Sequence, residues 1–191
     1  MHLKGVFFLR VQIDCIMAFY FCIQIVTVRP FGRGINKIIR TMEKTNIYTD
    51  EERYWMTGGN TGTLPTRIIP SVIYSLAPNE IFVFGSNALG MHHAGAARVA
   101  YNEFGAEWGN GEGLQGQSYS IPTMGGEHNT KLAIMRFTQY AREHPELKFL
   151  VTPVGCGIAG YTPEEIAPMF KDAAYLENVY LPISFWKVLM I

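Results

Sequence analysis

The chain has 191 residues, of which 48% are hydrophobic and 17% charged, a composition typical of globular proteins. The formal net charge is zero, but residues 1–41 carry six basic residues against one acid, and residues 42–191 carry ten against fifteen. The two parts therefore have net charges of +5 and −5. An acidic body argues against a nucleic-acid partner bound through its phosphate backbone, but it is compatible with one nucleotide held by backbone amides.

Residues 1–41 differ from the rest of the chain. Residues 11–28 are almost continuously apolar, with Asp14 as the one internal charge. This run is long for a signal peptide and has no small-residue cleavage site after it. As a membrane span it has marginal length and contains polar side chains that are costly in lipid. Three interpretations stay open: sequence upstream of a true start at Met42, a marginal membrane segment, or an integral strand or helix.

We therefore predict two parts, a doubtful N-terminal extension at 1–41 and a domain at 42–191 that makes no membrane contact. Cys15, Cys22 and Cys156 form no disulfide framework, and no metal-ligand spacing is present. We expect a cytoplasmic, reduced compartment, no metal and no cofactor.

The first predicted elements of the domain are a helix, a strand and a second helix. The segment 67–76 predicts a short helix with Pro70 in its first turn. The apolar run at 81–84 predicts a strand buried on both faces. Small and apolar residues at helical spacing predict a helix over 94–104, which Gly105 ends.

The next segments predict a loop, a strand, a helix and another strand. Four glycines in nine residues predict a loop at 109–117, followed by a short strand at 118–122. A clear apolar stripe predicts a helix over 130–143, and Pro145 ends it. The apolar residues 149–151 predict the following strand.

The last predicted elements are a capped helix and a final strand. Thr162 is a predicted N-cap, with Pro163 at the first helical position and Glu165 completing a capping box. Residues 178–189 predict a strand whose Val179, Leu181 and Ile183 alternate inward. The alternation of strands and helices predicts an α/β fold, a mostly parallel sheet with helices on both faces. Ligands bind such sheets at the carboxyl ends of the strands.

A first candidate ligand loop follows the strand at 81–84. A strand, a glycine-containing loop and a small-residue helix together direct free N–H groups and the positive end of a helix dipole at an anion. Asn87 either orients a ribose hydroxyl or a water, or bonds its own backbone in a turn. His92 or His93 is either a general acid or base, or an ordinary loop histidine.

A second candidate ligand loop contains three glycines between Gly155 and Tyr161. Successive amides in such a turn form an anion-binding concavity. Cys156 within it is either a nucleophile or a small buried residue. A third segment offers the amide side chains of Gln115 and Gln117 as further candidates to line the cleft.

These segments resemble the macro domains. The resemblance covers residues 67–185 and rests on GSNALGMHHAGAARVA, which is similar to their first ligand loop, and PVGCGIAGYTPEEIAPMF, which is similar to their diphosphate loop. The closest likeness is to a divergent bacterial and phage-associated macro-like group, with FVFGSN, GLQG and GCGIAG segments. It implies a three-layer α/β/α sandwich with a mixed, mostly parallel sheet that binds ADP-ribose.

The resemblance also implies roles for particular residues. Asn87 would position the distal ribose, Gly95 and Ala96 would lie at the ribose and phosphates, residues 155–160 would form the diphosphate loop, and Tyr161 would lie beside the distal ribose. Together with the candidates from the loop sequences, the predicted catalytic residues are Asn87 and His92. The predicted ligand-binding residues are Gly85, Ser86, Asn87, Gly95, Ala96, Gln115, Gly155, Cys156, Gly157, Ile158, Ala159, Gly160 and Tyr161.

The chain also departs from the family pattern. The usual Asn-Ala-Ala-Asn run is Gly-Ser-Asn-Ala here, no aspartate precedes the strand in the adenine-recognising position, and the double glutamate of the glycohydrolases is absent. We expect a protein that binds ADP-ribose or a related nucleotide diphosphate, with hydrolysis of an ADP-ribose linkage as an open question. The alternatives are a non-catalytic module that senses such a signal in phage–host conflict, and a hydrolase dependent on Cys156.

Overall fold

The structure is a computed structural model, and it describes residues 45–57 and 67–190, which belong to one compact unit, Lys44–Ile191. The predictions for residues 1–41 lie outside the described residues. None of the helices in the described ranges is long and apolar enough to span a membrane.

In chain order the elements are α3 (Asp50–Met56), β1 (Glu80–Ser86), α4 (Gly95–Glu103), β2 (Gly113–Gln115), β3 (Ser118–Pro122), α5 (Glu127–Glu143), β4 (Lys148–Val151), α6 (Pro163–Ile166), the 3₁₀ helix η1 (Ala167–Phe170), α7 (Lys171–Ala174), β5 (Val179–Tyr180) and α8 (Ile183–Leu189).

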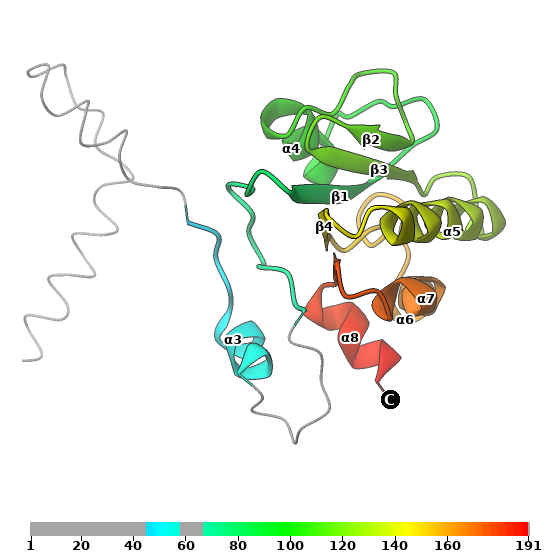
Figure 1. The fold of residues 1–191 in the computed structure, drawn as a ribbon. Helices are drawn as coiled ribbons and strands as arrows, with labels where there is room; N and C mark the ends of the chain where they lie inside the picture. Colours follow the sequence, from blue (N-terminus) through cyan, green and yellow to red (C-terminus); the bar gives the residue numbers. More distant parts are fainter. Residues whose placement is uncertain (1–44, 58–66, 191) are drawn as a thin grey trace, which may run out of the picture. The chain divides into compact units, whose positions relative to one another are not determined.

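The strands form one five-stranded sheet in the order β2-β3-β1-β4-β5 (Figure 1). β1 pairs in parallel with β3 and with β4, and β4 pairs in parallel with β5. β2 is antiparallel to β3. The predicted α/β class with a mixed, mostly parallel sheet is therefore confirmed.

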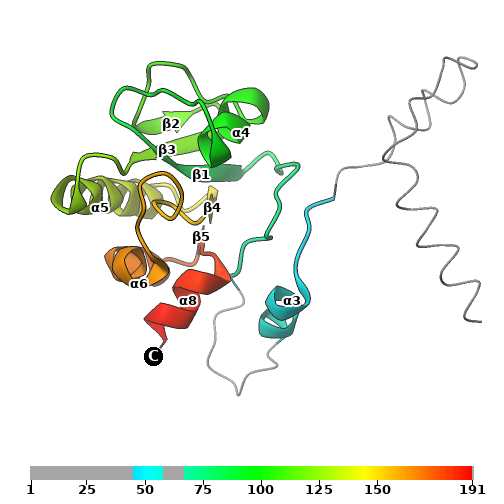
Figure 2. The ribbon, with the colours of Figure 1, turned by 180° about the vertical axis from the view of Figure 1, so that it is seen from behind.

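Helices cover both faces of this sheet, because consecutive residues of β1 point into different cores. Ile81 and Val83 pack with α5, η1 and α8, whereas Phe82 and Phe84 pack with α4. Figures 1 and 2 show α4 and α5 on opposite sides of β1 and β3. A strand buried on both faces has a continuous apolar sequence, as β1 does.

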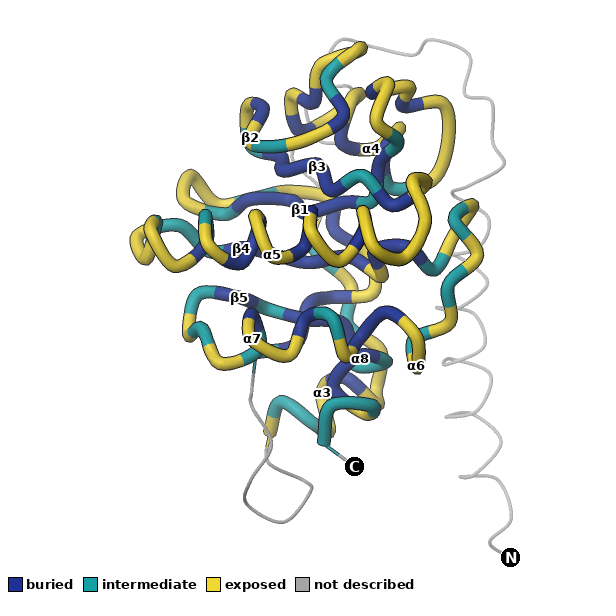
Figure 3. Tube along the Cα trace, turned by 90° about the vertical axis from the view of Figure 1, so that its right-hand side faces the viewer, coloured by how far each residue is buried: buried dark blue, intermediate teal, exposed yellow. Residues whose placement is uncertain are grey.

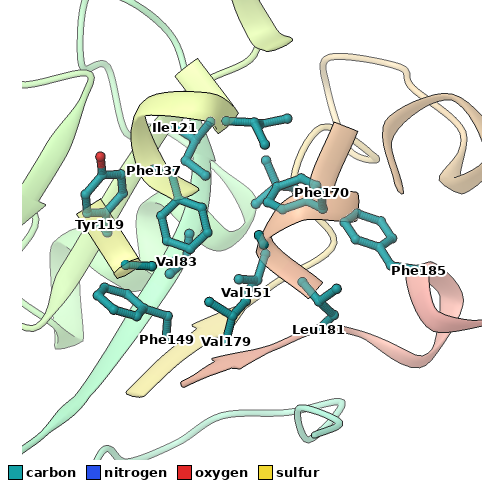
Figure 4. Close-up of a cluster of buried hydrophobic side chains, with 14 of the residues drawn as sticks. Val83, Tyr119, Ile121, Phe137, Phe149, Val151, Phe170, Val179, Leu181 and Phe185 are labelled. Carbon is teal, nitrogen blue, oxygen red and sulfur yellow. The ribbon is translucent and has the colours of Figure 1, made fainter. Parts of the chain in front are cut away.

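The larger core lies on the α5 side. Phe137 of α5 contacts Phe149 of β4 and Phe170 of η1, with ring centroids 5.6 and 6.3 Å apart (Figure 4). Phe185 of α8 continues this row at 5.5 Å from Phe170. Figure 3 shows the central strands as buried and the outer side of α5 as exposed. This apolar platform holds the ends of the central strands, and hence the loops that follow them, in fixed positions.

Several predicted elements are confirmed with small changes of boundary. The strand predicted at 118–122 is β3, and the helix predicted over 130–143 is α5, which begins three residues earlier. The capping box is present: Thr162 Oγ1 accepts from the Glu165 N–H, and Glu165 Oε2 accepts from the Thr162 N–H.

The helix predicted over 67–76 is wrong. This segment is extended: its Arg67–Ile69 stretch pairs with Leu181, and Val72 pairs with Ile47. Ile68 is buried in the larger core and Ile69 in the other, an alternation that only an extended chain produces. The backbone hydrogen bonds to Leu181 and Ile47 thus outweigh the weak helical spacing of the apolar residues.

Two further predictions need correction. Residues 178–189 form a strand only at Val179–Tyr180, because Pro182 is the N-cap of the helix α8 and its carbonyl accepts from the N–H groups of Phe185 and Trp186. The predicted loop at 109–117 contains β2, because Gly113–Gln115 pairs with the neighbouring strand β3 despite its high glycine content.

Candidate functional site

A cavity of about 500 Å³ lies at the carboxyl ends of β1, β3 and β4. After β1 the chain turns toward β3, and after β4 it turns toward β5. Neighbouring strands whose connections diverge in this way leave a crevice between them, and ligands of α/β proteins bind there. The described residues that line the cavity are Gly85, Ser86, Asn87, Met91, His93, Ala94, Gly95, Ala96, Ala97, Thr123, Met124, Thr152, Pro153, Gly155, Cys156, Gly157, Ile158 and Ala159.

The loop after β4 presents unpaired backbone N–H groups. Cys156 and Gly160 donate within the loop, to the carbonyl oxygens of Pro153 and Gly157. Four other N–H groups have no acceptor among the described residues; they belong to Gly155, Gly157, Ile158 and Ala159. Because a run of such groups carries partial positive charge, this loop suits an anion.

The start of α4 adds three more free N–H groups. The first backbone bond of this turn runs from the Arg98 N–H to the Ala94 carbonyl. The N-cap residue Ala94 has no side-chain acceptor, so the N–H groups of Gly95, Ala96 and Ala97 stay unpaired among the described residues. Their small side chains leave the helix end open, and its dipole favours negative charge.

The two loops meet where the strand ends are closest. A Cβ on Gly85 would lie 3.2 Å from the Gly155 nitrogen, so Gly85 allows the ends of β1 and β4 to approach. Gly155 has a φ of +81°, and a Cβ there would lie 3.1 Å from the Tyr161 ring. The positive φ therefore favours glycine at Gly155, and a side chain at Gly85 would force the two strand ends slightly apart.

Asn87 lines the cavity, but its side chain is already bonded. Its Oδ1 accepts from the N–H groups of Leu89 and Met91 at 3.1 and 3.2 Å. Its Nδ2 donates to the Met91 carbonyl at 2.9 Å, which leaves one Nδ2 hydrogen without a partner among the described residues. Of the two sequence interpretations, the structure shows the turn, and a ligand contact is limited to that one hydrogen.

Two predicted site residues lie away from the cavity. His92 is 1% exposed and its Nε2–H donates to the Glu107 carbonyl oxygen, 3.0 Å away. Gln115 is 4% exposed and bonds the Glu107 N–H, the Asn110 carbonyl and Ser120 Oγ. Both are needed to hold the loop after α4, so neither is free to touch a ligand in this structure.

Gly160 and Tyr161 also do not line the cavity. Tyr161 packs behind the loop, with its hydroxyl 3.4 Å from Thr130 Oγ1, and its ring lies against Gly155. Tyr161 therefore supports the shape of the loop. The remaining predicted residues are brought together at the cavity: Gly85, Ser86, Asn87, Gly95, Ala96, Gly155, Cys156, Gly157, Ile158 and Ala159.

The sequence prediction missed eight lining residues, of which Ala94, Ala97 and Pro153 adjoin predicted ones in the same two loops. Thr123 and Met124 follow the predicted strand 118–122, so their place at a carboxyl end was a usable signal. Thr152 follows β4 in the same way. Met91 and His93 lie in the first loop, where sequence spacing alone does not tell which of two adjacent histidines turns inward.

The described lining residues carry few ionisable groups. They are His93 and Cys156, with no carboxylate, lysine or arginine among them. Burial, and then the charge of Glu164, raise the pKa of the Cys156 thiol, which disfavours a thiolate. Within the described ranges no group of three or more His, Cys, Asp or Glu is placed to hold a metal.

No protein-family model, curated protein or solved structure matches the chain.

Proposed function

We propose that the cavity binds a nucleotide diphosphate of the ADP-ribose type. The observation that carries this proposal is the set of seven unpaired N–H groups, from two separate loops, beside one cavity. Because the described lining has no cationic side chain, an anion there would be held by backbone dipoles. The volume of about 500 Å³ lies within the range of roughly 300–1,000 Å³ typical of small-molecule sites.

The apolar part of the lining supports a ligand with a ring as well as an anion. Met91, Met124 and Ile158 line the cavity and are 44%, 54% and 79% exposed. Exposed apolar side chains that gather around a cavity typically mark a binding surface. A nucleotide combines an anionic diphosphate with planar, partly apolar rings, and so matches both parts.

The proposal is for binding, because the lining offers little for turnover. Asn87 is committed to the turn and His92 is buried elsewhere. The raised pKa of Cys156 supplies no reason to prefer the cysteine-dependent hydrolase.

The test is calorimetric titration of the full chain with ADP-ribose, with AMP and ribose 5-phosphate as controls. We expect a Kd below about 100 μM for ADP-ribose, equivalent to roughly −5.5 kcal/mol, and weaker binding of both fragments. Absence of heat with all three compounds at millimolar concentration would contradict the proposal.

Two substitutions that place opposite charges at the same position make this test more specific. Ile158 is 79% exposed, so replacing it should leave the fold intact. Ile158→Glu should bind ADP-ribose several-fold more weakly than Ile158→Lys, because both variants lose the same apolar side chain but put opposite charges beside a bound diphosphate. Tyr175→Glu, at a 76% exposed position outside the lining, is the matched control and should change nothing. Equal affinities for both Ile158 variants would mean that no anion binds here.

A further inference from the structure

A cluster of aromatic side chains adjoins one wall of the cavity. Trp108, in the loop after α4, is 50% exposed, and its ring centroid lies 4.7 Å from that of His93, which lines the cavity. Tyr101 of α4 is 47% exposed and lies 6.0 Å from Trp108. We refer to His93, Tyr101 and Trp108 as the aromatic ledge.

The loop that carries Trp108 is held by bonds that do not involve the indole. The Gly109 N–H donates to the Gly90 carbonyl at 3.0 Å, and the buried Gln115 side chain bonds the Glu107 N–H and the Asn110 carbonyl. The Trp108 indole Nε1–H donates to no acceptor among the described residues. A half-exposed tryptophan on a loop fixed by other means is available to a ligand.

The aromatic ledge is close to the proposed binding position of the diphosphate. His93 lies two residues before Gly95, whose N–H begins the uncapped turn of α4, so their Cα atoms are at most about 7 Å apart. One ribose bridges a distance of this order. A ligand phosphate at the start of α4 would therefore lie close enough to the ledge for the next ring of the ligand to reach it.

On these grounds we propose that the ligand is a dinucleoside diphosphate, with one planar ring against the apolar residues Met124 and Ile158 and the second stacked on the ledge. This inference rests on the proposed function and specifies its ligand. ADP-ribose has only one such ring and would leave the ledge uncovered. Stacking of a base on an aromatic side chain favours binding by roughly five- to 150-fold.

The experiment compares diadenosine diphosphate with ADP-ribose on the full chain, because the two carry the same diphosphate charge and differ in the second ring. We expect diadenosine diphosphate to bind at least about tenfold more tightly. Trp108→Ala should remove this advantage and leave the affinity for ADP-ribose unchanged. Trp108→Phe should keep most of it, since a planar ring remains.

Tyr175→Ala is the control, at an exposed aromatic position outside the cavity lining, and should alter neither affinity. Equal affinity of the wild-type chain for the two compounds would overturn the inference and leave the proposed function standing. An equal loss of both affinities in Trp108→Ala would also overturn it, since the indole would then act through the loop. Binding of neither compound to the wild-type chain would end both proposals together.

Discussion

Asn87 shows how a side chain beside a cavity serves the backbone around it. Three hydrogen bonds from its amide group fix the turn from Asn87 to Met91, and the Gly90 N–H bonds the Asn87 carbonyl. This turn sets the path of the chain through His93 to the start of α4. The residue acts by shaping the site as well as by lining it.

Replacing Asn87 tests its role in shaping the site. Asn87→Ala removes all three bonds and should lower the free energy of unfolding by about 1–3 kcal/mol. Asn87→Asp keeps both bonds accepted by Oδ1 and should cost less, about 1 kcal/mol. Urea unfolding of both variants measures this difference. If Asn87→Ala keeps wild-type stability, the turn does not depend on the side chain.

Two glycines give a matched pair for the same change. A Cβ on Gly111 would lie 2.3 Å from the Asn87 carbonyl oxygen, whereas a Cβ on Gly157 meets nothing within 4 Å. Gly111→Ala should therefore lower the free energy of unfolding by about 2 kcal/mol or more, and Gly157→Ala by less than about 0.5 kcal/mol. Thermal unfolding of both variants provides the comparison; similar shifts would show that the loops do not pack as closely as described.

Among the elements, α4 is the one whose local stability and proposed function conflict. A side-chain acceptor at Ala94 would satisfy one of the free N–H groups of the first turn, and its extended backbone, with φ −151° and ψ 169°, suits an N-cap residue. The absence of a cap leaves those groups open toward the cavity.

Ala94→Asp tests that conflict. The new carboxylate should cap α4 and raise the free energy of unfolding by about 0.5–2 kcal/mol. The same carboxylate should weaken ADP-ribose binding at least tenfold, because it would occupy the anion site and repel the negatively charged diphosphate. Ala94→Ser should give much of the stability with a smaller loss of binding. A stabilised Ala94→Asp variant with unchanged affinity would exclude the start of α4 from the site.

At the same scale, the sequence predicted best those elements that depend on local signals. The Thr162 capping box and the apolar stripe of α5 are such signals. The segment at 67–72 was predicted wrongly because its backbone pairing partners are not its neighbours in sequence. Ile68 pairs with Leu181, close to the end of the chain, and Val72 pairs with Ile47, which precedes α3. The β5–α8 boundary depends on Pro182, the extended N-cap of α8, which interrupts the alternating apolar pattern on which the predicted strand rested.

For the whole molecule, the Glu80–Lys148 ion pair joins the starts of β1 and β4, with Nζ 2.8 Å from Oε1. Burial alone would raise the pKa of Glu80, but the hydrogen bond from Lys148, the bond from the Ala77 N–H and the Lys148 charge together hold it below its ordinary value of 4.5. A lowered carboxyl pKa stabilises the fold at neutral pH, and this contribution is lost as the pH falls below about 4.5.

Glu80→Gln should therefore reduce the free energy of unfolding by about 1 kcal/mol at pH 7 and by progressively less toward pH 3. Denaturant unfolding at a series of pH values measures the difference between the two proteins. A difference that stays constant from pH 7 to pH 3 would contradict the assigned role of the pair.

The site as a whole was predictable where it depended on strand ends. Glycine loops after two parallel strands had to meet at one edge of the sheet, and the structure brings Gly95 and Gly155 to one cavity. The choice between His92 and His93 was not predictable, since it depends on the Trp108 loop packing over the first ligand loop. Gln115 was misplaced because its three partners are known only once that loop is folded.

The most direct test of the central claim is an amide ¹H–¹⁵N NMR titration of the full chain with ADP-ribose. The account predicts the largest shifts at the unpaired N–H groups of Gly95, Ala96, Ala97, Gly155, Gly157, Ile158 and Ala159. The N–H groups of Cys156 and Gly160, already bonded within the same loop, should shift less. Shifts that are absent, or that lie at other residues while these seven stay unchanged, would contradict the claim that backbone amides of the two loops hold an anion.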